Sequence, residues 1–117
     1  MLQSMIEQIK KQPDSVEFQQ VMDEIASSYH YTPAAFSNGL GDDLVLNEAG
    51  TNEGSCKIFA FARLNRLSQS ETLACFGRYY REDVLQHPEN TDHANIRTFM
   101  RYGWEGVVFT AEVLRRI

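Results

Sequence analysis

The chain has 117 residues, of which 43% are hydrophobic and 11% aromatic, so we expect one folded domain over residues 1–117 rather than a disordered chain. No apolar run approaches the roughly 20 residues of a membrane span, and the start lacks the pattern of a secretory signal peptide, which predicts a soluble cytoplasmic protein. The net charge is −5, and residues 12–56 contain eight acidic residues but no Lys or Arg. Such a segment repels phosphate backbones, so neither nucleic acid nor a membrane is an expected partner.

Two helices are predicted at the start of the chain. Apolar residues recur at helical spacing from Leu2 to Ile9, and Pro13 ends that pattern. Asp14 is a suitable N-cap for a second helix, with Glu17 completing a capping-box-like pair. One apolar stripe then continues at helical spacing: Phe18, Val21, Met22, Ile25 and Tyr29.

The middle of the chain predicts a third, short helix in "YTPAAF", because Thr32 suits an N-cap and Pro33 the first helical position. Residues 44–46 are too few for a prediction, and residues 47–55 read as a loop. The segment "CKIFAFARLNRL", residues 56–67, is nearly all apolar and fits a buried strand or a buried helix. Its length and its Ala and Leu content favour the helix.

Three more helices are predicted in the second half. Ser68 and Glu71 form a capping box for a helix that ends near Pro88. A further helix follows the "TD" of residues 91–92, and a terminal helix is indicated over residues 113–117. The expected fold class is therefore all-α, a single globular domain of about six helices packed like an orthogonal bundle, with little or no strand.

One cluster of acidic and imidazole side chains is a candidate metal or catalytic site. If the helix before Pro88 runs through His87, then Asp83 and His87 share one face and could ligate a divalent cation, with Asp92 and His93 as further ligands. The competing interpretation, which we favour, is a helix end followed by an N-cap. In that case Asp92 caps the next helix and His87 interacts with the helix dipole. A divalent metal is expected only under the first interpretation, and no other cofactor is predicted.

The segment "GTNEGSCK", residues 50–57, lacks the spacing of a phosphate-binding loop, since three residues rather than four separate its glycines. An anion site at the start of the following helix stays open as an alternative, although Glu53 would oppose an anion. We favour a capping role for Thr51, Asn52 or Ser55.

No signature of nucleophilic catalysis or of dinucleotide binding is present in the sequence. Cys56 and Cys75 are predicted to be buried free thiols. Whether the chain is an enzyme stays open.

Binding of a protein partner is the leading functional hypothesis. Asp42 and Asp43 lie in the acidic segment and are candidate contacts for a partner, although we favour the interpretation that acids there balance arginines of the second half or are simply solvated. Trp104 is a second candidate contact, although core packing is the interpretation that we favour for it.

Three blocks of sequence carry a family resemblance. Within residues 32–110, "TNEGSCKIFAFA", "FGRYYREDVL" and "DHANIR", the last followed by "FM" and "GW", resemble the HopJ type III effector family. The resemblance implies a small bacterial protein that a type III secretion system delivers into a host cell, and it implies no enzymatic activity or catalytic residues. The helical pattern that begins at Leu2 favours the alternative of a protein that stays in the bacterial cytoplasm.

Overall fold

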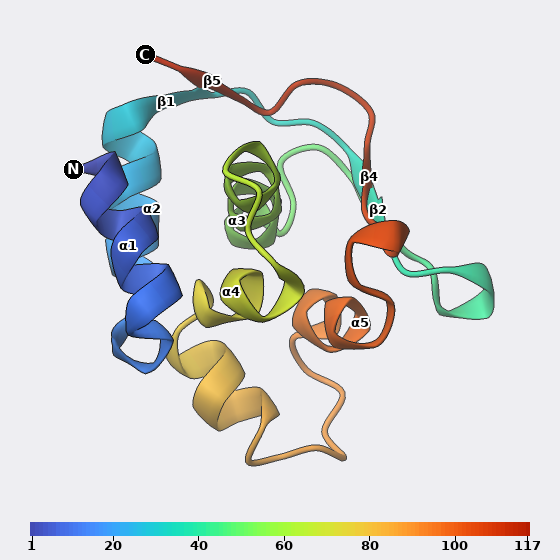
Figure 1. Cartoon of the computed structure of the whole chain (residues 1–117). Coiled ribbons are helices and arrows are strands. Elements are labelled where there is room, and N and C mark those ends of the chain that lie inside the picture. The colour runs from blue at the N-terminus through green and yellow to red at the C-terminus, as the bar shows by residue number, and fades with distance from the viewer.

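Helix α3 (Glu53–Leu64) lies at the centre of the molecule, surrounded by the other elements. In the computed structural model, which describes residues 1–117, four further α-helices are present (Figure 1). They are α1 (Leu2–Lys11), α2 (Phe18–Ser28), α4 (Gln69–Ala74) and α5 (Ala94–Tyr102). In the view of Figure 1, helices α1 and α2 lie to the left of α3, and α4 and α5 lie below it. None of these helices has the length and apolar character needed to cross a membrane.

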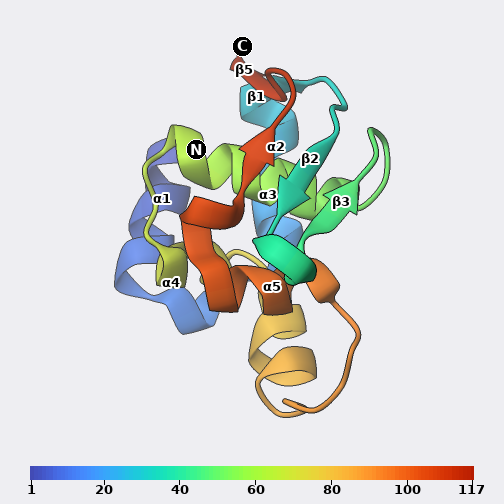
Figure 2. The same ribbon diagram turned by 90° about the vertical axis from the view of Figure 1, so that its right-hand side faces the viewer.

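Five short strands form two antiparallel sheets that complete the cover of α3. Strand β1 (Tyr29–Tyr31) pairs with β5 (Leu114–Arg116). Strand β2 (Phe36–Asn38) lies between β3 (Val45–Asn47) and β4 (Val108–Phe109), and Figure 2 shows this second sheet face on.

The expectation of an all-α fold is therefore wrong, and two segments account for the error. The predicted helix in "YTPAAF" is absent: residues 32–35 connect β1 to β2, and the Thr32 amide donates to the Val113 carbonyl of the chain beside it. The predicted terminal helix is instead β5, which buries Leu114 against the core. The fold is mixed, with helices and two small sheets.

Most of the predicted helices are present, with changed ends. Helix α2 begins after Glu17 rather than Asp14, and Gln20 completes its capping box. The helix predicted from Ser68 to about Pro88 is broken at Gly77, which has φ +58°. A Cβ on Gly77 would come within 2.6 Å of the Phe18 backbone nitrogen, so this close approach requires glycine. The chain continues as a π-helical segment, η3 (Tyr79–Val84).

Phe59, from the middle of α3, is the centre of the hydrophobic core. Its side chain is fully buried, and its ring lies within 6.3 Å, centroid to centroid, of four other aromatic rings. These rings belong to Phe36, Phe76, Phe99 and Trp104. Strand β2, helix α5 and the segments that follow α4 and α5 therefore all pack on Phe59.

We predict that Phe59→Ala lowers the free energy of unfolding by about 3–5 kcal/mol, because it opens a cavity where these elements meet. Urea denaturation measures the change. Leu64→Ala, near the end of the same helix where the leucine is 55% exposed, is the matched control and should cost less than about 1 kcal/mol. Equal losses for the two variants would contradict this account of the core.

Both cysteines are free and buried, as predicted. Burial raises the pKa of the Cys75 thiol to about 12, and burial also raises the pKa of Cys56. Because the thiolate is the reactive form, neither cysteine should react with a disulfide reagent in the native protein near pH 8, and both should react after unfolding. Rapid modification of the native protein, followed by mass spectrometry, would show instead that a thiol is accessible.

Candidate functional site

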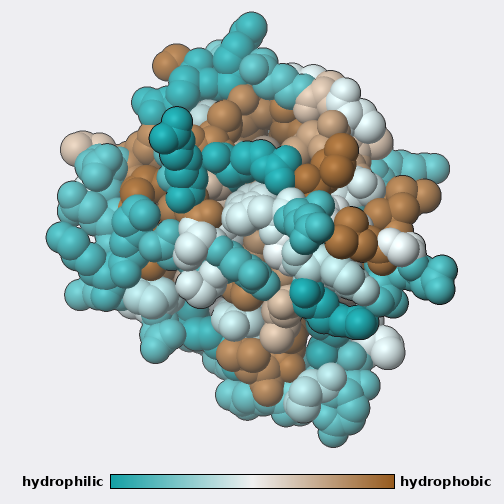
Figure 3. All heavy atoms as spheres, turned by 45° about the vertical axis from the view of Figure 1, so that its right-hand side comes forward, coloured by the Kyte–Doolittle hydropathy of each residue, from teal (hydrophilic) through white to brown (hydrophobic).

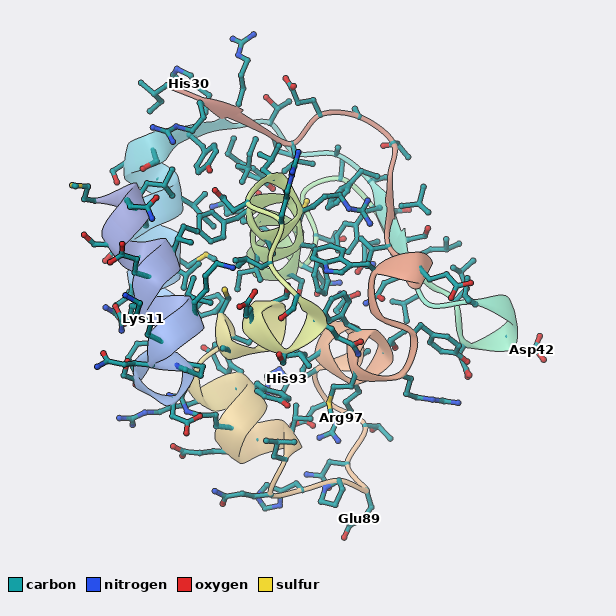
Figure 4. The ribbon with its side chains drawn as sticks, viewed as in Figure 1. Lys11, His30, Asp42, Glu89, His93 and Arg97 are labelled. Atoms are coloured by element: carbon teal, nitrogen blue, oxygen red, sulfur yellow. The ribbon has the colours of Figure 1, made fainter.

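His93 and Asp83 are the two predicted site residues that the structure brings into direct contact. His93 Nε2 lies 3.0 Å from Asp83 Oδ2, and the imidazole ring packs beside the Tyr79 ring at 5.3 Å between centroids. His93 directly precedes α5, and its backbone is left-handed, with φ 52° and ψ 49°. Figure 4 shows His93 between α5 and the segment that follows α4. Such a conformation is uncommon outside glycine and often marks a functional position.

Of the other two members of the predicted cluster, Asp92 lies near the pair, with its Oδ2 3.9 Å from His93 Nε2, whereas His87 lies apart. His87 is exposed beyond the end of η3 and makes no side-chain hydrogen bond or ion pair, so it does not join Asp83 as the helical spacing suggested. Asp92 is not the N-cap of α5. Its Oδ1 instead accepts a 2.7 Å hydrogen bond from Arg97, which lowers the pKa of the Asp92 carboxyl. No group of three or more His, Cys, Asp or Glu side chains is arranged to hold a metal ion.

Arg97 holds the loop before His93 against α5. Its guanidinium donates to the carbonyl oxygens of Asp83, Pro88 and Asp92 as well as to the Asp92 carboxylate. The Arg97 side chain is only 16% exposed, although its partner carboxylate on Asp92 is 52% exposed. The Arg97 hydrogen bonds fix the start of α5 relative to η3, and therefore fix His93 relative to Asp83.

A cavity of about 440 Å³ opens beside His93. It lies where the starts of α3 and α5 meet η3 and α2, and its volume is within the range of small-molecule sites. Its polar lining includes Asn52, Ser55, His93 and Asn95, and its apolar lining includes Phe18, Val45, Phe76, Tyr79 and Ile96.

Two helices begin at this cavity without a side-chain cap. The N-cap residues are Asn52 for α3 and His93 for α5, and both are left-handed. Neither side chain bonds its own helix, because Asn52 donates to Asn47 and His93 contacts Asp83. The backbone N–H groups in each first turn therefore lack an intrahelical acceptor, and Gly54, Ser55, Asn95 and Ile96 all line the cavity. This arrangement corrects the expectation that a side chain of residues 51–55 caps α3.

Three buried asparagines stand behind the cavity. Asn47 and Asn95 exchange hydrogen bonds of 3.2 and 2.8 Å between their amides, and Asn38 Nδ2 donates to Asn95 Oδ1 and to the Asn95 carbonyl. Asn38 Oδ1 is buried with no partner. The sequence analysis missed this cluster. The feature that could have revealed the cluster is an asparagine at an inward-facing position of the segments "FSN" and "VLN". That feature can be recognised only if these segments are known to be strands.

The residues predicted to contact a partner lie away from the cavity. Asp42 is exposed at the tip of the β2–β3 hairpin, in η2 (Gly41–Asp43), as Figure 4 shows. Asp43 accepts a hydrogen bond from the Tyr102 hydroxyl and pairs with Arg101 at 3.2 Å. Trp104 packs on Phe59 and Phe99 and donates from Nε1 to the Leu67 carbonyl. Packing therefore occupies most of the indole.

Two of three comparisons with known proteins found a match, and one of them names a family. No curated protein matches the sequence. A solved structure described as "Crystal structure of unknown function protein VPA0580" is similar over 100% of this chain and 94% of its own, with 50% identity and a TM-score of 0.95. The sequence model of the HopJ type III effector proteins matches residues 2–114. Since this match spans nearly the whole chain, the resemblance is confirmed: the chain belongs to the HopJ type III effector protein family.

Proposed function

We propose that this HopJ-family domain binds a small ligand with an anionic group in the cavity between the starts of α3 and α5. The observation that carries the proposal is the convergence of two uncapped helix starts on one cavity beside His93. Free N–H groups and the positive end of the helix dipole favour a phosphate or a carboxylate at such a place. The family name implies that its members act inside a host cell, so a host metabolite is the proposed source of the ligand.

The objection raised by Glu53 loses force in this arrangement. Although Glu53 is in the first turn of α3, its carboxylate accepts a 2.7 Å hydrogen bond from the Tyr31 hydroxyl. Glu53 is not part of the cavity lining. The carboxylates of Asp83 and Asp92 lie 3.0 and 3.9 Å from His93 Nε2, and neither residue lines the cavity. An anion would therefore meet N–H groups and an imidazole first.

The apolar wall indicates the rest of the ligand. The rings of Phe18 and Tyr79 meet edge to face at 5.1 Å, and both border the cavity together with Phe76. Such a wall suits a flat, apolar body attached to the anionic group. We therefore propose an aromatic phosphate or carboxylate as the ligand class.

Binding is a better description than nucleophilic catalysis. The hydrogen bonds of His93 go to a carboxylate, and no serine, cysteine or tyrosine donates to its ring. An activated nucleophile would need such a contact with a base. The His93–Asp83 contact is therefore proposed to hold the imidazole in place as part of the cavity wall.

The first test is a titration followed by ¹⁵N NMR. Phenyl phosphate and benzoate should shift the amide signals of Gly54, Ser55, Asn95 and Ile96, whereas benzyl alcohol, which lacks the charge, should bind at least about tenfold more weakly. A titration with inorganic phosphate alone measures the affinity that the anionic group contributes without the aromatic ring. If the anions and the alcohol shift the same signals equally, the proposal of an anion site fails.

A matched pair of variants tests the helix starts. Ser55→Asp places a carboxylate in the first turn of α3, where it should stabilise the helix by about 0.3–1 kcal/mol while it repels the ligand. Phenyl phosphate affinity should fall about tenfold or more, although the thermal midpoint does not fall. Ser70→Asp makes the same change in the first turn of α4, away from the cavity, and should leave affinity unchanged. If both variants lost affinity, the loss would not depend on placing the carboxylate at the cavity, and the proposal of an anion site there would fail.

The metal alternative keeps one observation in its favour, the contact between His93 and Asp83. It predicts a rise in the thermal midpoint with Zn²⁺ or Mn²⁺ that is lost in His93→Ala. His87→Ala is the control, because His87 lies apart from the pair in this structure. No rise in the wild-type protein would count against a metal site at Asp83, His87, Asp92 and His93.

A further inference from the structure

The outer face of the β3–β2–β4 sheet carries a row of side chains that the core does not use. The strand register places Ser37 between Leu46 and Val108, so these three side chains cross the sheet side by side. On the opposite face, Phe36, Asn38 and Asn47 point into the molecule and are buried. This alternation means that Leu46 and Val108 face solvent because of the register, and no rotation of a side chain would bury them.

These two residues are among the most exposed large apolar side chains of the chain. Leu46 is 76% exposed and Val108 58%, and Leu44, two residues before Leu46, is 45% exposed. A shallow groove of about 280 Å³ runs beside them, with Ala35 and Thr110 in its lining. Figure 3 shows apolar surface on the side of the molecule that carries this sheet, interrupted by hydrophilic side chains. Large apolar side chains exposed together on one face are a feature of interaction sites.

Uncompensated negative charge flanks the row along the chain. Asp42 precedes Leu44, and Glu48 follows Leu46 and borders the groove. Neither carboxylate forms an ion pair, whereas Asp43 is paired with Arg101. Because residues 12–56 contain no Lys or Arg, no basic side chain of this segment is available to neutralise them. A partner with basic residues on both sides of an apolar centre would complement this surface in charge and in polarity.

Strand β3 also forms an open edge of the sheet, since only β2 pairs with it. Its sequence contains neither proline nor lysine, the residues that commonly protect an exposed edge. The strand has three residues, so backbone pairing alone would supply few hydrogen bonds. The apolar row and the two carboxylates must therefore supply the remaining affinity and the specificity.

We infer that the β3 edge and the Leu46–Ser37–Val108 row are a docking site for an extended segment of a partner protein, with an apolar centre flanked by Lys or Arg. The segment would pair along β3, so that an outward apolar side chain lies beside Leu46 and its basic side chains lie near Asp42 and Glu48. This site is separate from the cavity, and it does not depend on the anion proposal.

The test uses two synthetic peptides of about nine residues with the same alternating Val and Thr centre, one with Lys and Arg at its ends and one with Glu and Asp. The basic peptide should shift the amide signals of residues 44–48 and 108 in ¹⁵N NMR and saturate. The acidic peptide should bind at least about tenfold more weakly. Asp42→Lys/Glu48→Lys should reverse this preference. Failure of the basic peptide to shift these signals at millimolar concentration would overturn the proposal.

Two further variants separate a docking site from an unfolded protein or a self-interface. Leu46→Ser/Val108→Ser should abolish peptide binding without lowering the thermal midpoint, because both side chains are exposed, and should leave phenyl phosphate binding at the cavity intact. Leu64→Ser, at a leucine of α3 that is 55% exposed, should change neither the peptide binding nor the phenyl phosphate binding. Sedimentation of the wild-type protein tests whether a second copy of this chain occupies the face instead. A dimer that Leu46→Ser/Val108→Ser dissociates would show that a second copy covers this face, and the partner proposal would then be wrong.

Discussion

The burial of α3 on nearly all of its faces is the constraint on which the rest of the structure depends. Six of its residues are buried, including Ile58, Phe59 and Phe61, which are fully inaccessible. A helix that is apolar on every side needs cover on every side. Four other helices do not close this shell, and the remaining gaps are filled by extended chain. The Ala34 carbonyl accepts the Cys56 thiol at 3.8 Å, and Phe36 packs on Phe59. The small sheets therefore exist as cover for a central helix, which is why a strong pattern of helices coexists with strands that are only two or three residues long.

Polar contacts, in contrast, determine where α5 begins. The buried asparagines join β2 and β3 to Asn95 in the first turn of α5, and Arg97 joins the same turn to the loop after η3. Buried amides stabilise little in net terms when they are paired, but they cost about 1–3 kcal/mol each when they are not. The cluster therefore permits one position of the helix start and disfavours others. In this molecule the apolar contacts determine that the domain is folded, and the amide and guanidinium contacts determine the shape of the candidate site.

The helices of the core were predictable because their signals are local. The spacing of Met5, Ile6 and Ile9 and the Ser68–Glu71 capping box each depend on neighbours in sequence. The strands were not predictable in the same way, since Phe36–Asn38 becomes a strand only by pairing with chain at residues 45–47 and 108–109. The candidate site likewise contains residues that could be predicted from the sequence and residues that could not. Asp83 and His93 could be nominated from their residue types. The sequence nevertheless suggested Asp83 with His87, because a regular helix through His87 was assumed, whereas η3 is π-helical and ends at Val84. Asn38, Asn47 and Asn95 are far apart in sequence, and nothing local marks them as one cluster.

The uncapped helix starts have a cost that the rest of the fold must offset. A side-chain cap typically stabilises a helix by about 1 kcal/mol, and asparagine, the N-cap residue of α3, is among the residue types that provide one. Asn52 and His93 instead bond Asn47 and Asp83, and both adopt left-handed backbone that is uncommon for residues other than glycine. The same side-chain contacts that remove the caps hold the two helix starts in place around the cavity. The N–H groups are thus fixed before any ligand arrives, and a ligand that accepts hydrogen bonds from them would restore interactions that the folded chain alone leaves unmade.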